Sequence, residues 1–163
     1  MTTHVLPHLS SGDHPTDRAR GWFALTVLAT SLLHLALHAV AYATLLRHVY
    51  AAYPEGTPEF VAQLHRPAAE LVVWAMAATS LGMGAFITTV IRWSGARTGA
   101  DGLRRGVVLG LLFWTAVNSG LYASSHLFSL PAVLVDTPVS ALCMALASAF
   151  AAWMLHARDE RSS

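Results

Sequence analysis

The sequence predicts an all-α integral membrane protein, a bundle of four spanning helices with both termini in the cytoplasm. Apolar residues make up 55% of its 163 residues and charged residues only 12%, about half the charged share of a soluble domain. The apolar residues fall into four long stretches, without the period-two alternation expected of an outer-membrane barrel. Lipid is therefore the expected solvent for most of the surface.

Each apolar stretch has close to the roughly 20 residues that a helix needs to cross the hydrocarbon layer. The predicted spans are residues 21–46, 67–91, 106–122 and 138–156. Together they form a transmembrane domain over residues 21–156. Residues 1–20 and 157–163 are expected to be polar cytoplasmic tails.

Prolines mark two of the expected helix starts, because a proline at the first helical position leaves no N–H unpaired. Pro67 is expected to open the second span, with Glu70 in its first turn. Pro138 is expected to open the fourth span, with Thr137 as its N-cap. Asp136 then precedes the helix, where its charge is favourable, at the outer surface of the membrane.

The arginines predict the orientation of the spans. The sequence has ten arginines and no lysine. Eight fall in the tails and in the loop after the second span: Arg18, Arg20, Arg92, Arg97, Arg104, Arg105, Arg158 and Arg161. Only Arg47 and Arg66 fall on the opposite side. Arginine-rich short loops stay in the cytoplasm, so we expect a multi-pass protein of a bacterial inner membrane with cytoplasmic ends.

The outer loops are expected to lie against the membrane. Thr57, Pro58 and Glu59 form a helix-start pattern, which predicts a short interfacial helix through His65 in the first outer loop. The last outer segment, residues 126–136, is too apolar to favour water. It should rest on lipid headgroups or on another protein.

Small residues at four-residue spacing predict where helices pack closely, because lipid provides no hydrophobic drive for helix association. The third span carries Gly102, Gly106 and Gly110 at or before its inner half. The second carries Ala78 and Gly82. Their partners may belong to this chain or to another subunit, and the pattern does not distinguish the two.

A seam of polar side chains along two spans is the main candidate site, because its members share one face of each helix. They are Ser31, His34, His38 and Tyr42 on the first span, and Thr115, Asn118 and Tyr122 on the third. His34 is expected near the bilayer centre, and His38 about 6 Å farther out. We expect Asn118 to form a hydrogen bond with one of these histidines, worth about 0.6–2 kcal/mol.

Three roles for this seam stay open: helix registration, cofactor ligation and proton transfer. His34 and His38 lie on one side of one helix, so they cannot clamp a haem between them. A five-coordinate haem or bacteriochlorophyll needs only one of them. A proton relay lacks a carboxylate at this depth, because Glu70 and Asp136 are expected at the outer surface.

Other site chemistry has less support. An outer group of imidazoles and carboxylates has ligand types that suit zinc or copper but no ligand-like spacing, so no metal site is predicted. Its members are His48, His65, Glu70, His126 and Asp136. The tail residues His4, His8 and His14 are expected to be solvated. The sequence has no nucleophile elbow or phosphate-binding loop, and no basic patch that would indicate a nucleic-acid partner.

These observations favour a non-catalytic accessory or scaffolding subunit of a larger membrane complex, of a photosynthetic or respiratory kind. Its expected partners are the lipid bilayer and other integral membrane subunits. The alternative is a protein that ligates haem or bacteriochlorophyll through His34 or His38.

Overall fold

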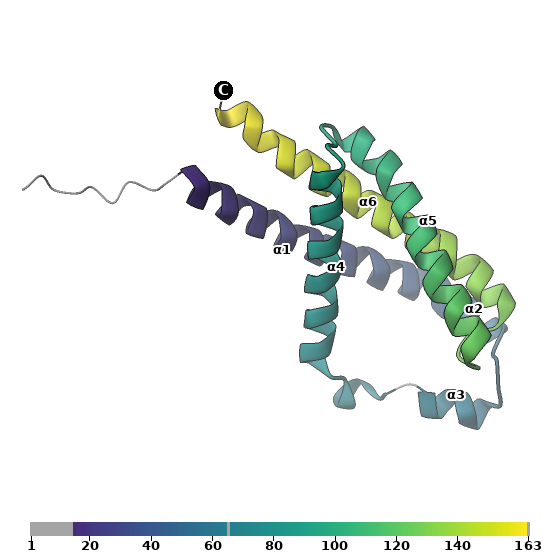
Figure 1. Ribbon diagram of the computed structural model, residues 1–163. Helices are drawn as coiled ribbons and strands as arrows, with labels where there is room; N and C mark the ends of the chain where they lie inside the picture. The colour runs from purple at the N-terminus through teal and green to yellow at the C-terminus, as the bar shows by residue number, and fades with distance from the viewer. Residues whose placement is uncertain (1–14, 65, 163) are drawn as a thin grey trace, which may run out of the picture.

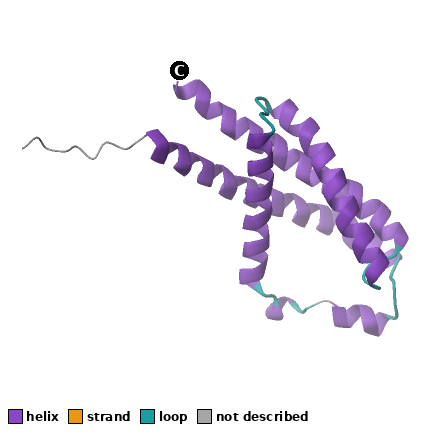
Figure 2. Cartoon of the chain, in the orientation of Figure 1, coloured by secondary structure: helices purple, strands orange, loops and turns teal. Residues whose placement is uncertain are grey.

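A computed structural model describes residues 15–64 and 66–162. This part of the chain consists of helices and connecting loops, without a strand (Figure 2). Four of its helical segments are long and apolar enough to cross a membrane: Ala19–Ala52, Val73–Trp93, Gly99–Ser124 and Leu130–Ala157. The predicted all-α fold is confirmed, and so are four helices with the length and apolar composition that a membrane span needs.

The first span consists of three successive helical segments. Helix α1 (Pro15–Ala41) continues into a single π-helical turn (Tyr42–Leu46), which leads directly into α2 (Arg47–Ala52). The span is therefore longer than the predicted 21–46 at both ends. Its continuation beyond Leu46 carries Tyr50, which the candidate site uses.

A connecting segment at the opposite end from the chain termini leads to the second span (Figure 1). It contains the expected short helix, α3 (Pro58–Leu64), where the Thr57 hydroxyl accepts a bond from the Phe60 N–H at 3.3 Å. The Glu59 carboxylate has a lowered pKa, because its own backbone N–H and the Thr57 hydroxyl both donate to it. His65 lies outside the described residues, and the placement of α3 in the interface stays a prediction.

The predicted start of the second span at Pro67 is wrong. Pro67 has an extended backbone (ψ 153°) and precedes only a 3₁₀ turn at Ala68–Glu70. Leu71 is again extended (ψ 131°), so α4 begins at Val73 and runs to Trp93. Pro67 therefore starts only the short turn that lies between α3 and α4.

A tight turn joins α4 to α5 (Gly99–Ser124). Gly95 adopts a positive φ of 69°, and this conformation ends α4 without the steric cost that a Cβ would add. The Thr98 hydroxyl then accepts a bond from the Asp101 N–H at 3.1 Å and caps the start of α5. The third span therefore begins before the predicted residue 106.

The predicted start of the fourth span at Pro138 is also wrong. Helix α6 runs from Leu130 to Ser162, with Pro138 inside it. Its first turn already forms at the Ser129 carbonyl, which accepts from the Val133 N–H at 3.0 Å. Pro131 in this first turn was the better signal for the helix start. Thr137 is therefore a helical residue, and Asp136 lies within the span.

Helix α6 is the centre of the bundle, because it packs against α5, α1 and α4. Helix α1 also packs against α4. In contrast, α4 and α5 diverge from each other beyond the turn that joins them (Figure 1). No Cα atom of α1 lies within 8 Å of one in α5, so the first and third spans are not the direct pair that the sequence suggested.

The three glycines of α5 form the contact with α6. All three are buried, and α6 presents small residues to them. A Cβ on Gly106 would lie 2.7 Å from the Cα of Ala145, and one on Gly110 would lie 2.9 Å from the Cα of Ala141. Gly102 would meet the α6 backbone in the same way. The absence of side chains here lets the two backbones approach.

The second predicted packing stripe does not pack inside this chain. Ala78 and Gly82 are exposed on α4, and a Cβ on Gly82 would meet nothing within 4 Å. Gly84 makes the contact instead, because its Cα lies directly against Ser31 of α1. The correction follows from where α4 is buried, because its buried residues, Gly84, Ile87, Thr88 and Ile91, all lie in its C-terminal half.

Candidate functional site

The carboxylate of Asp136 is the centre of a buried polar cluster inside the spans. Asp136 is only 8% exposed and lies inside α6, which corrects its predicted place before the helix. Its Oδ1 accepts from the Tyr50 hydroxyl at 3.0 Å and from the Ser140 hydroxyl at 3.2 Å. Its Oδ2 accepts from the Asn118 amide at 2.6 Å. Three donors thus satisfy a carboxylate that would otherwise be costly to bury in a membrane.

Asn118 joins α5 to α6 through this cluster. It is 2% exposed, and its Nδ2 also donates to the Thr137 hydroxyl at 3.0 Å. The predicted hydrogen bond between Asn118 and a histidine is wrong, because the carboxylate of Asp136 is the stronger acceptor and lies directly opposite on α6. Sequence reasoning missed Asp136 because it placed the residue before the helix.

The π-helical turn brings Tyr50 to the carboxylate. In a regular helix, eight residues advance by about 800°, which leaves Tyr42 and Tyr50 roughly 80° apart around the axis. The π-helical turn holds one additional residue, so these eight residues turn through the same angle as seven residues of a regular helix. The angle between Tyr42 and Tyr50 around the axis then falls to about 20°. The two rings accordingly lie 6.4 Å apart. Tyr50 also contacts the Phe128 ring, at 5.4 Å.

The rings of the two seam histidines contact each other next to this cluster, with their planes tilted by 46°. Their ring centroids are 4.2 Å apart, and the His38 ring lies 5.6 Å from that of Trp114. His38 Nδ1 lies 3.1 Å from the His34 carbonyl oxygen. A carbonyl can only accept, so this bond assigns the hydrogen to Nδ1 and leaves a lone pair on Nε2 of the neutral ring. This is the tautomer in which a histidine offers Nε2 as an acceptor or ligand.

Several polar atoms in this region have no hydrogen-bond partner. The Nε2 atoms of His34 and His38 and the Nε1 atom of Trp114 are all buried and unpaired. Such groups are rare in native proteins and indicate strain, a bound molecule or a functional role.

A cavity of about 310 Å³ lies between His38 and the carboxylate of Asp136. Its walls include His38, Tyr50, Trp114, Asn118 and Asp136, so residues from α1, α2, α5 and α6 contribute. Its volume is at the low end of the range for small-molecule pockets. The arrangement can hold a small molecule that presents both a donor and an acceptor.

The remaining residues of the predicted seam, all within the described part of the chain, donate no hydrogen bond to the carboxylate of Asp136. Thr115 and Tyr122 are exposed on α5, so they do not take part. Ser31 is buried, but its hydroxyl donates to the Val27 carbonyl at 2.8 Å and its side chain faces Gly84. Tyr42 is 49% exposed and lines the rim of the cavity. The structure therefore brings together only part of the seam and adds Asp136, Tyr50, Ser140 and Trp114.

The outer group of imidazoles and carboxylates does not assemble. Within the described residues no three such side chains are placed to hold a metal ion. His48 lies next to the Arg47 guanidinium, whose Nε donates to it at 3.3 Å. His126 pairs with Glu55 at 3.8 Å. His65 and the tail histidines lie outside the described part of the chain.

The fold and the buried cluster define the class: a multi-pass α-helical membrane protein with an ionisable residue held inside its spans. Comparison with protein-family models, with curated proteins and with solved structures finds no match to this chain.

Proposed function

We propose that this protein is a non-catalytic membrane subunit that binds a small lipid-soluble ligand in the cavity beside His38. The observation that carries the proposal is the presence of two unpaired nitrogens, on His38 and Trp114, in the wall of a 310 Å³ cavity. An unpaired polar group inside a membrane span costs free energy unless a partner satisfies it. A ligand would satisfy both nitrogens.

The chemistry of these two nitrogens describes the ligand. His38 Nε2 offers a lone pair, and Trp114 Nε1 offers a hydrogen. A hydroxyl group that donates to the histidine and accepts from the tryptophan fits both, as does a ring with one hydroxyl and one carbonyl. Both nitrogens are covered in the ligand-free protein, so binding must move a neighbouring side chain.

The ligand in this proposal could also be a haem or bacteriochlorophyll, whose metal His38 Nε2 would hold. The hydrogen bond at Nδ1 favours His38 over His34, because it orients the ring as metal-binding histidines are oriented. Such a macrocycle is wider than the cavity and would extend from it into the lipid.

His38→Gln tests the ligand site. A small molecule is expected to co-purify with the wild type in mild detergent. We expect the variant to contain at most about one tenth of that amount. The reason is that losing one good hydrogen bond or metal bond removes about 1.4 kcal/mol or more of binding free energy. The bound molecule is extracted with solvent and identified by mass spectrometry. An absorption spectrum from about 350 to 900 nm is recorded on the same sample.

The matched control is His126→Gln, an exposed histidine that does not line the cavity, which should retain the ligand in full. A Soret or near-infrared band that disappears only in His38→Gln would identify a tetrapyrrole. Absence of any extracted molecule or band from the wild type, or equal retention by both variants, would contradict the proposal.

A second candidate function is the scaffolding role in a larger complex, of a photosynthetic or respiratory kind. The observation in its favour is the exposed Ala78–Gly82 stripe of α4. Small residues on an exposed membrane helix permit close approach by another helix. Lipid gains nothing from this smooth surface, whereas a partner subunit would.

Gly82→Leu tests this role, because nothing in this chain occupies the space into which leucine would extend. We expect an unchanged unfolding midpoint for the isolated protein, within about 0.5 kcal/mol, and loss of the companion subunits that co-purify with the wild type. Quantitative mass spectrometry of the affinity-purified complex measures this. Met76→Leu, on a different exposed face of α4, is the control that should keep the partners. Intact co-purification by Gly82→Leu would exclude the stripe as the interface.

A further inference from the structure

A second cavity, also of about 310 Å³, lies at the end of the bundle that carries both termini. Three segments meet there: the start of α1, the turn between α4 and α5, and the end of α6. Trp22 fastens two of them, since its Nε1 donates to the Met154 carbonyl at 3.0 Å. The cavity therefore has fixed walls, although it lies at the edge of the membrane spans.

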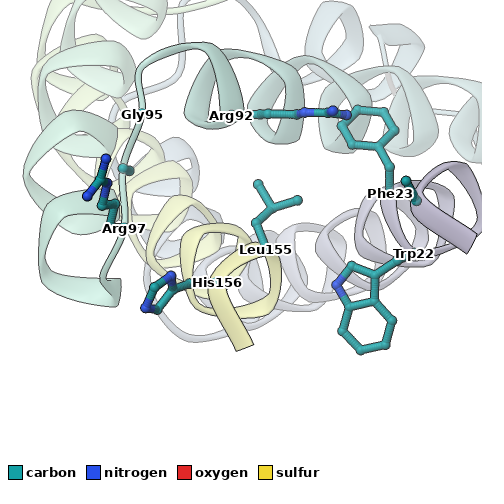
Figure 3. Close-up of a pocket in the computed structure, with 9 residues that line it drawn as sticks. Trp22, Phe23, Arg92, Gly95, Arg97, Leu155 and His156 are labelled. Carbon is teal, nitrogen blue, oxygen red and sulfur yellow. The ribbon is translucent and has the colours of Figure 1, made fainter. Parts of the chain in front are cut away.

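Among the described side chains, the ionisable groups that line this cavity are all basic. They are Arg92, Arg97 and His156, and no described acidic side chain lines it. Figure 3 shows Arg92 extended beside Phe23 on one side, and Arg97 and His156 on the other, with Leu155 between them. Within the described side chains, no carboxylate forms an ion pair with either arginine.

The guanidinium of Arg92 is held in place by an aromatic ring. Its Cζ lies 5.2 Å from the centroid of Phe23, which is within the range of a cation–π contact. This contact orients the group and leaves its N–H donors available. Arginine presents these donors in a planar fork that matches the oxygens of a phosphate.

We propose that this cavity binds the phosphate of an anionic phospholipid headgroup. Two arginines supply the positive charge, and the apolar side chains of Trp22, Phe23 and Leu155 supply a surface for the glycerol and first acyl carbons. The location favours a lipid over soluble phosphate, because the site lies where a spanning helix enters the headgroup layer. It is also the face that the arginine distribution predicts to be cytoplasmic.

The test is a titration of the full-length protein in mild detergent with short-chain phosphatidylglycerol. The thermal unfolding midpoint is measured at each lipid concentration. We expect the midpoint to rise with phosphatidylglycerol and to change little with phosphatidylcholine of the same chain length. In Arg92→Gln/Arg97→Gln, at least tenfold more phosphatidylglycerol should be needed for the same rise. Loss of charge-assisted hydrogen bonds to phosphate has an effect of this size.

Arg104→Gln/Arg105→Gln is the matched control, because it removes two arginines from the same side of the protein outside this cavity. It should titrate like the wild type. If the double variant of the cavity fails to fold, Arg97→Gln alone replaces it, because Arg97 takes no part in the cation–π contact.

Three results would overturn the proposal. The first is an equal response to phosphatidylcholine. The second is a titration of the cavity variant that matches the wild type. The third is an equal rise with sodium phosphate alone, which would assign the cavity to a soluble anion instead of a lipid.

Discussion

Gly106→Leu is expected to prevent the stable packing of α5 on α6. A Cβ at this position would already lie 2.7 Å from the Cα of Ala145, so a leucine must push two backbones apart. Insertion of bulk into a packed interior costs about 1–3 kcal/mol when side chains can adjust, and more when the backbone must move. Because α6 is the centre of the bundle, we expect a loss of more than about 3 kcal/mol.

Unfolding of the purified protein with increasing denaturing detergent measures this loss. Gly120→Leu is the control, because Gly120 lies on the same helix and a Cβ there would meet nothing within 4 Å. It should unfold within about 0.5 kcal/mol of the wild type. A Gly106→Leu protein as stable as the Gly120→Leu protein would show that the α5–α6 contact does not determine stability.

Asp136→Ala is expected to destabilise the protein by about 2–4 kcal/mol. The change removes the acceptor shared by Tyr50, Asn118 and Ser140. These donors would then be left unpaired in an environment that offers little water. The loss should appear in the same unfolding experiment, and the change should also free α2 from α6, because the Tyr50 bond joins them.

A double-mutant cycle isolates the bond between Asp136 and Asn118. Asn118→Ala should cost about 1–2 kcal/mol alone, and the two changes together should cost less than their sum, with a coupling of about 1 kcal/mol or more. Thr115→Ala, on an exposed part of the same helix, should have no measurable effect. Strict additivity of Asn118→Ala and Asp136→Ala would mean that the 2.6 Å contact does not stabilise the fold.

The histidines show why part of the site was accessible from the sequence. His34 and His38 were expected to face the bundle or a partner because polar side chains inside a span avoid lipid; His34 is buried, and the half-buried His38 lines the cavity. Their spacing of four residues placed them on one face of the helix, and their rings lie 4.2 Å apart. Their role in ligand binding stays a prediction.

Asp136 shows why the rest was not accessible. The sequence offered Thr137–Pro138 as a helix start, and this local signal is physically sound. In the structure, Ser129 and Pro131 start α6 two turns earlier, and this extension carries the carboxylate into the bundle. Only the neighbouring helices, which supply Tyr50 and Asn118 as donors, make this burial stable.

The sequence by itself determined the solvent, the helical class and the number of spans. These follow from composition and segment length, because a chain in lipid must satisfy its backbone within each helix. Tertiary structure alone decided which helices touch. It directed the glycines of α5 to α6, left the Ala78–Gly82 stripe exposed, and joined Asp136 to Asn118. The physical reason is that helix packing in lipid depends on the shapes of two surfaces together, and a single helix sequence describes only one of them.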